Sequence, residues 1–192
     1  MLNFDRNIRC SFYAVTVLLG IGIGVFGLSR PSFAAPASPK GGQSGIVFTA
    51  TLDKTQYAPQ EPVNLTFVLK NKGKSPVYVN KRFYFASQEA PKNQKEVYVM
   101  ITAPSGKKLS FKSPHETGYP KMDYFTLLEP GQEVQSEYPR NLRENFEFDE
   151  EGVYSAVTVY QNTFGRELGL EVFGGKLAAE PVKFVIKNAG GK

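Results

Sequence analysis

The sequence predicts an all-β protein, an antiparallel β-sandwich of seven to nine strands. From residue 46 onward, apolar residues recur at every second position, which is the period of a half-buried strand. No window keeps the spacing of three and four residues that an amphipathic helix requires. Phe and Tyr, which suit strands, are abundant, with 15 and 10 copies among 192 residues. Short strands separated by turn residues are typical of a sandwich.

Residues 1–34 have the layout of a secretory signal peptide: a basic start, an apolar middle and small residues before a cut. Arg6 and Arg9 precede the uncharged stretch 11–28, and Ala34 ends the segment. That stretch is shorter than the ~20 apolar residues of a usual spanning helix, which favours cleavage over a retained anchor. We expect a secreted or periplasmic protein; the alternative is a chain anchored to the membrane by an uncleaved leader.

The rest of the chain divides into three parts. Residues 35–45 are rich in Pro, Gly and small residues and are expected to form a flexible leader. Residues 46–188 carry the strand pattern and form the domain, and residues 189–192 are expected to be a disordered tail. The single cysteine, Cys10, lies in the signal peptide, so the exported domain depends on its core without disulfides.

The first strands are predicted over residues 46–52 and 62–70, where every second residue is apolar. The turn that follows contains Gly73, which we expect at positive φ. A third strand over residues 76–85 carries Lys81 among its apolar positions, which predicts a bulge or an edge there.

Later strands follow the same period, with turn residues between them. Pro130 and Gly131 suit the centre of a type II turn. The expected strands cover residues 96–102, 108–112, 123–128, 133–139 and 182–187.

Near the C-terminal third, Glu150, Gly152 and Tyr154 stand at alternate positions before an apolar run. This spacing resembles the tyrosine corner of immunoglobulin-like sandwiches, in which the tyrosine hydroxyl bonds back to upstream backbone. Ala156 stands where antibody domains carry a cysteine, so the resemblance covers the architecture only. The expected fold is therefore an immunoglobulin-like or fibronectin-III-like sandwich.

A wider pattern runs through residues 57–79, 127–142 and 151–160. It is similar to the amino-terminal sandwich domain of deuterolysin-type metalloproteases and to the proteinase-inhibitor-like family of Bacillus. The resemblance covers roughly residues 46–160 and implies a fold. A secreted proteinase inhibitor is the alternative function that it adds.

Catalytic motifs are missing from the sequence. His115 is the only histidine, so neither an H-E-x-x-H helix nor a zinc cluster of several histidines can form, and no nucleophile elbow accompanies it. We expect a protein that is not an enzyme and that has no cofactor and no metal. The acids within residues 144–151 leave a carbohydrate-active enzyme as a less favoured alternative, because glycoside hydrolysis needs only two carboxylates.

Charge is segregated along the chain. Residues 54–121 hold twelve Lys or Arg against four Glu, and residues 122–151 hold two Arg against nine acids. The favoured interpretation is two solvated faces that attract each other across neighbouring strands. The alternative is a basic patch for acidic polysaccharide or membrane headgroups. Nucleic acid is not expected, because a strand explains the interleaved aromatics of residues 80–85 equally well.

The segment 162–178 is long for a connection between two strands, and long loops are often functional. It mixes glycines with apolar residues and is expected at the same end of the sandwich as the turn 71–75. We expect either a small hairpin packed on the sheet or a binding tip for an unknown protein partner. The partner-binding candidates are Lys72, Lys74, Phe164, Arg166, Leu168, Leu170 and Phe173.

Overall fold

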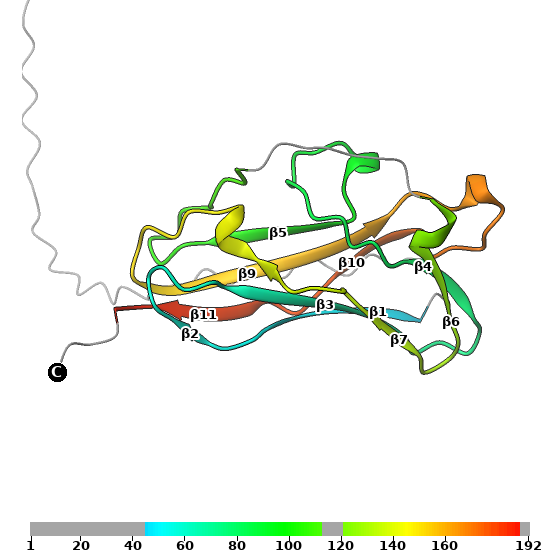
Figure 1. Cartoon of the computed structure of the whole chain (residues 1–192), viewed down its shortest axis with the longest axis horizontal. Helices are drawn as coiled ribbons and strands as arrows, with labels where there is room; N and C mark the ends of the chain where they lie inside the picture. The colour runs from blue at the N-terminus through cyan, green and yellow to red at the C-terminus, as the bar shows by residue number, and fades with distance from the viewer. Residues whose placement is uncertain (1–44, 113–120, 189–192) are drawn as a thin grey trace, which may run out of the picture. The chain divides into compact units, whose positions relative to one another are not determined.

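The structure, a computed structural model, describes residues 45–112 and 121–188, and within them the protein is all-β (Figure 1). The predicted signal peptide (residues 1–34), residues 35–44, His115 and the expected tail 189–192 lie outside the described residues. Within the described part, no helix is long and apolar enough to span a bilayer. The helical elements there are the 3₁₀ turns η1 (Lys92–Gln94), η2 (Met122–Tyr124), η3 (Leu142–Glu144) and η4 (Arg166–Leu168).

The first sheet is built around β3. Its members are β1 (Ile46–Leu52), β3 (Asn64–Asn71), β7 (Glu133–Gln135) and β8 (Arg140–Asn141). β1 pairs antiparallel with one edge of β3, while β7 and β8 pair antiparallel with successive parts of the other edge. β7 and β8 are thus two halves of one interrupted edge strand.

The second sheet is built around the long strand β9. Its members are β9 (Gly152–Asn162), β5 (Val97–Thr102), β10 (Gly175–Ala178), β11 (Val182–Ile186) and β2 (Gln56–Tyr57). β5 covers one edge of β9, while β10 and β11 share the other, and β2 joins β11 in parallel. The remaining strands, β4 (Val77–Asn80) and β6 (Phe125–Leu128), form an antiparallel pair.

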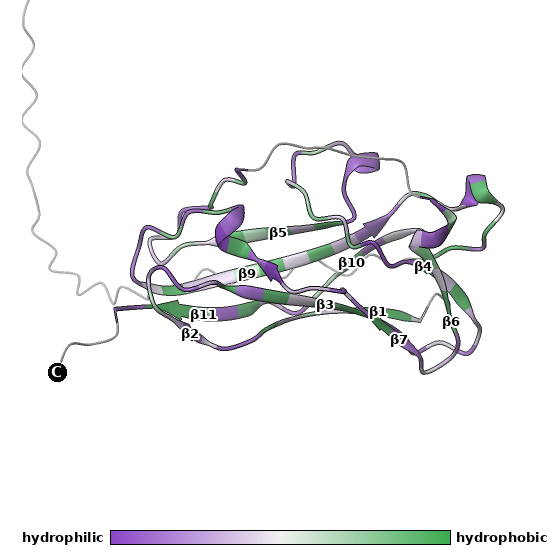
Figure 2. Cartoon of the chain, in the orientation of Figure 1, coloured by the Kyte–Doolittle hydropathy of each residue, from purple (hydrophilic) through white to green (hydrophobic). Residues whose placement is uncertain are grey.

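Apolar side chains from both sheets meet in one core. Residues of β3 alternate without exception between buried and half-buried. Figure 2 shows that this strand carries both hydrophobic and hydrophilic residues. The ring of Phe48 on β1 lies 5.7 Å from that of Tyr160 on β9 and 6.1 Å from that of Phe67 on β3. This confirms the predicted antiparallel sandwich. The described residues hold eleven strands where seven to nine were expected, because one edge strand is divided into β7 and β8, and the short strands β2 and β10 lie in segments expected as connections.

The tyrosine corner is present at the start of β9. The Tyr154 hydroxyl donates to the Glu150 carbonyl over 2.7 Å and accepts from the Glu150 amide over 3.0 Å, and the side chain is fully buried. The carboxylate of Glu150 accepts from the amide and hydroxyl of Ser105, 2.9 and 2.7 Å away. The acidic run before this strand therefore ties two neighbouring turns together.

The charge segregation joins neighbouring strands, as the favoured interpretation predicts. Lys70 on β3 and Glu133 on β7 are cross-strand partners, with Nζ 2.9 Å from Oε2. Lys112 also pairs with Glu147, and neither of these two residues lies in a strand. Both pairs join the basic segment to the acidic one.

Several local expectations differ from the structure. Gly73 is not among the glycines at positive φ; its backbone instead lies against Gly45, where a Cβ would be 2.3 Å from the Gly73 Cα. Residues 108–112 form only an isolated bridge between Lys108 and Thr102. The strand expected over 76–85 ends at Asn80, just before Lys81.

Candidate functional site

A groove opens where the β7–β8 edge of the first sheet meets the end of the β4–β6 pair. We call it the edge groove. It has a volume of about 520 Å³, which lies within the usual range for ligand sites. Its lining residues are Lys81, Arg82, Phe83, Tyr124, Gln135, Ser136, Glu137, Tyr138 and Arg140.

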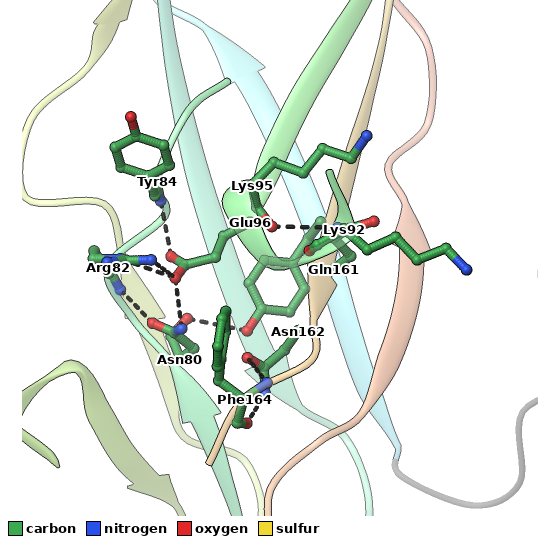
Figure 3. Close-up of polar contacts among 10 residues, drawn as sticks. Asn80, Arg82, Tyr84, Lys92, Lys95, Glu96, Gln161, Asn162 and Phe164 are labelled. Atoms are coloured by element: carbon green, nitrogen blue, oxygen red, sulfur yellow. Dashed lines mark hydrogen bonds and ion pairs between the residues drawn. The ribbon is translucent and has the colours of Figure 1, made fainter. Parts of the chain in front are cut away.

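One wall of the edge groove is fixed by a buried ion pair (Figure 3). Glu96, only 1% exposed, immediately precedes β5, and its Oε1 accepts from Arg82 Nη2 over 2.6 Å and from Arg82 Nε over 2.9 Å. Asn80 Nδ2 donates to the same oxygen over 2.7 Å, and the Tyr84 amide donates to Oε2 over 2.9 Å. Every oxygen of this carboxylate is therefore bonded, which a buried charge requires.

Aromatic side chains also contact the residues that surround Glu96. The Arg82 guanidinium lies 5.2 Å from the Tyr84 ring centroid and 5.1 Å from that of Tyr124, within range of cation–π attraction. The Tyr160 hydroxyl donates to the Asn80 carbonyl over 3.0 Å, and burial, with the nearby Glu96 charge, raises the pKa of that tyrosine. The cluster joins β4, β5, η2 and β9 into one rigid support for the groove.

Phe83 lies at the floor of the edge groove and is the one non-glycine residue at positive φ in the described part, with φ 48°. Its side chain is buried and packs on the rings of Phe67 and Tyr160, with centroids 6.1 and 6.0 Å away. A left-handed backbone in a bulky residue costs of order 1–3 kcal/mol, and such residues cluster at functional sites. Here the strained backbone lets Phe83 enter the core while Arg82 turns toward Glu96.

The opposite wall is a β-bulge between β7 and β8. Val68 pairs with Gln135 and Leu65 pairs with Arg140, so two residues of β3 face the four residues 136–139. Ser136 holds the bulge to β3, since its amide donates to the Phe67 carbonyl over 2.9 Å. The residues after Ser136 are displaced outward, and Tyr138 is 70% exposed. Bulges at sheet edges re-aim side chains in this way.

The segment 162–178 is a hairpin folded onto the molecule. The Phe173 amide donates to the Tyr78 carbonyl over 2.8 Å, and the Phe173 ring is buried against Tyr160, 6.0 Å between centroids. Phe173 therefore belongs to the core and is not available to a partner. Leu168, Leu170 and Phe164 are half-buried.

The other predicted partner-binding residues lie at least partly on the surface. Phe164 and Arg166 line a second hollow of about 290 Å³, and Arg166 is exposed. Lys72 and Lys74 are exposed in the turn that precedes β4, and β4 is the strand that Glu171–Phe173 pair with. A partner-binding role for this hairpin stays a prediction.

The edge groove was not predicted from the sequence, although one signal, at Lys81, points to it. Lys81 breaks the apolar period of the third strand, and the structure places the strand end and the strained Phe83 at that point. The residues 133–139 read as a continuous strand, because a bulge leaves no mark on a short polar segment. Tyr138 and Arg140 reach one surface with Tyr124 only through the sheet pairing.

Comparisons with known proteins give no family. No family model and no curated protein sequence matches this chain. Among solved structures, the chain is similar to the sporulation control protein Spo0M from Bacillus subtilis, with 13% identity and a TM-score of 0.40. The match covers 74% of this chain and 49% of Spo0M, so the chain spans about half the length of that protein.

Proposed function

We propose that the chain is an exported, non-catalytic binding domain that recognises a protein partner through the edge groove. The observation that carries this proposal is the exposed Tyr138, displaced by a bulge beside Arg140 and Tyr124. Tyr and Arg are the residue types that most often dominate protein interfaces. The rigid support beneath them, including the buried Arg82–Glu96 pair, favours a preorganised contact surface.

Exposed apolar side chains around the groove also support a protein partner. Among the described residues the exposed large apolar side chains are Met122, Leu127, Tyr138 and Val153. Met122 shares η2 with Tyr124, and Leu127 lies three residues further along β6. Three of the four therefore belong to the groove or to an element that borders it. Exposed apolar groups rimmed by charge often mark interaction sites.

Capture of the partner with matched variants tests the proposal. The exported protein, purified from cells that express the full chain, serves as bait in the native envelope fraction. Tyr138→Ser should remove the captured protein while the circular dichroism spectrum stays unchanged, because Tyr138 is mostly exposed. Val153→Ser, at an exposed apolar residue outside the groove, is the control and should keep capture.

The same preparation tests the hairpin 162–178. If the Phe164→Ser, Arg166→Gln variant loses capture and Tyr138→Ser keeps it, the contact surface is the hairpin and the edge groove is wrong. The Phe173→Ser change is unsuitable, since Phe173 belongs to the core.

Export and the alternative function are tested separately. Export rests on the layout of residues 1–34, and the mass of the protein recovered outside the cytoplasm should correspond to a chain that begins after Ala34. The proteinase-inhibitor alternative rests on the resemblance to the Bacillus inhibitor-like family. It predicts stoichiometric inhibition of at least one secreted protease, so unchanged protease activity across a panel rejects it.

A further inference from the structure

The charge of the edge groove is set by two cations that have no ion-pair partner among the described residues. Arg82 is compensated by the buried Glu96, 2.6 Å away. Lys81 and Arg140 also line the groove, both are exposed, and neither takes part in an ion pair within residues 45–112 and 121–188. Glu137 is the only acid in the lining. The groove therefore offers two uncompensated positive charges against one negative charge.

The edge strands beside the groove are poorly suited to pairing with another strand. β7 has three residues, β8 has two, and a bulge that ends in Pro139 separates them. Short edges, bulges and proline are devices that prevent a sheet edge from adding strands. Recognition at this edge therefore depends on side chains, namely Lys81, Arg140 and the exposed ring of Tyr138.

We propose that the edge groove binds an acidic peptide segment of the partner protein. Carboxylates of the segment pair with Lys81 and Arg140, and an apolar side chain of the segment packs on Tyr138. Charge complementarity selects the acidic segment, and the exposed ring of Tyr138 adds apolar contact. This inference rests on the proposed function, because it names the chemistry that the same groove recognises.

Fluorescence anisotropy with a defined peptide tests the inference. The probe is a labelled 12-residue peptide of alternating Glu and Leu, titrated with the exported protein at low salt. We expect saturable binding that weakens as salt increases, since exposed ion pairs are screened.

The double variant Lys81→Gln, Arg140→Gln should lower the affinity for the peptide about tenfold, and Tyr138→Ser by a similar factor. The double variant Lys183→Gln, Lys187→Gln removes two exposed charges at the β11 strand and should leave the affinity within about twofold.

Several outcomes would overturn the inference. These are an absence of peptide binding, equal binding of a Lys–Leu peptide, or equal losses in the groove and β11 variants. Binding of polygalacturonate that depends on Lys81 and Arg140, with no peptide binding, would assign the groove to acidic polysaccharide instead. If Tyr138→Ser abolishes capture of the native partner but no acidic peptide binds, the proposed function stands and only the peptide chemistry is wrong.

Discussion

At the residue scale, Glu96 decides how the groove is built. Glu96 is the first residue of the strand predicted over 96–102. The alternation of apolar residues in the sequence gives no reason to expect that this glutamate is buried. Its burial follows from tertiary contacts, because Asn80 at the end of β4, and Arg82 and the Tyr84 amide just after it, all donate to the Glu96 carboxylate. A carboxylate with so many donors is stable inside the protein only while all of them are present.

Replacing Glu96 by Gln should destabilise the domain by about 3 kcal/mol, because it leaves Arg82 partly buried without its counter-charge. Urea unfolding followed by circular dichroism measures the change. Glu133→Gln is the matched control, since its pair with Lys70 is exposed and should contribute less than about 1 kcal/mol. Equal stability of the two variants would contradict a structural role for the buried pair.

At the element scale, strands with one buried face could be predicted and interrupted strands could not. In β1, β3 and β11, the apolar residues at every second position of the sequence are the ones that face the core. The inward faces of these strands were therefore predicted correctly. Two features depend on long-range contacts. The end of β4, just before Lys81, depends on the contact between Arg82 and Glu96, and the bulge at 136–139 depends on the contact between Ser136 and Phe67. Both walls of the groove are therefore formed by segments whose structure is hardest to predict from the local sequence pattern.

The turn into β9 offers a prediction at this scale. Gly152 has φ 130°, and a Cβ there would lie 2.9 Å from Pro104 Cγ. Gly152→Ala should therefore destabilise the domain by about 3 kcal/mol, through backbone strain and overlap together. Gly169→Ala, at φ 75° with no atom within 4 Å of the new Cβ, should cost about 1 kcal/mol from strain alone.

Thermal and urea unfolding of both alanine variants measure the difference. If Gly152→Ala is no more destabilising than Gly169→Ala, Pro104 moves aside at little cost and the turn is more adaptable than its geometry indicates.

At the scale of the whole molecule, aromatic rings join the two sheets. The ring of Phe48 on β1 lies 5.7 Å from that of Tyr160 on β9 and so crosses from one sheet to the other. Within the second sheet, Tyr154 stacks on Phe184 with centroids 5.4 Å apart, and Tyr57 meets the edge of the same Phe184 at 5.8 Å. Tyr154 could be predicted from the corner spacing in the sequence. Tyr57, whose hydroxyl lies 2.6 Å from Asp53 Oδ1, and Tyr160 could not, because their partners are set by the fold.

These buried tyrosines make stability sensitive to alkaline pH. Burial raises the pKa of Tyr57, Tyr154 and Tyr160 in the folded state, with nearby acids adding to the effect. A raised folded pKa stabilises the protein fully below the unfolded value of about 10, and this stabilisation is lost as the pH rises above it. The free energy of unfolding should therefore fall with pH above about 10, and part of the phenolate absorbance at 295 nm should develop only as the β-sheet signal is lost.

Tyr160→Phe should make this fall in the free energy of unfolding less steep, since it removes one of the protons that unfolding releases. Complete tyrosine ionisation with an intact β-sheet spectrum would show that the core admits these charges without unfolding, and the aromatic contacts between the sheets would then not account for the cohesion of the sandwich.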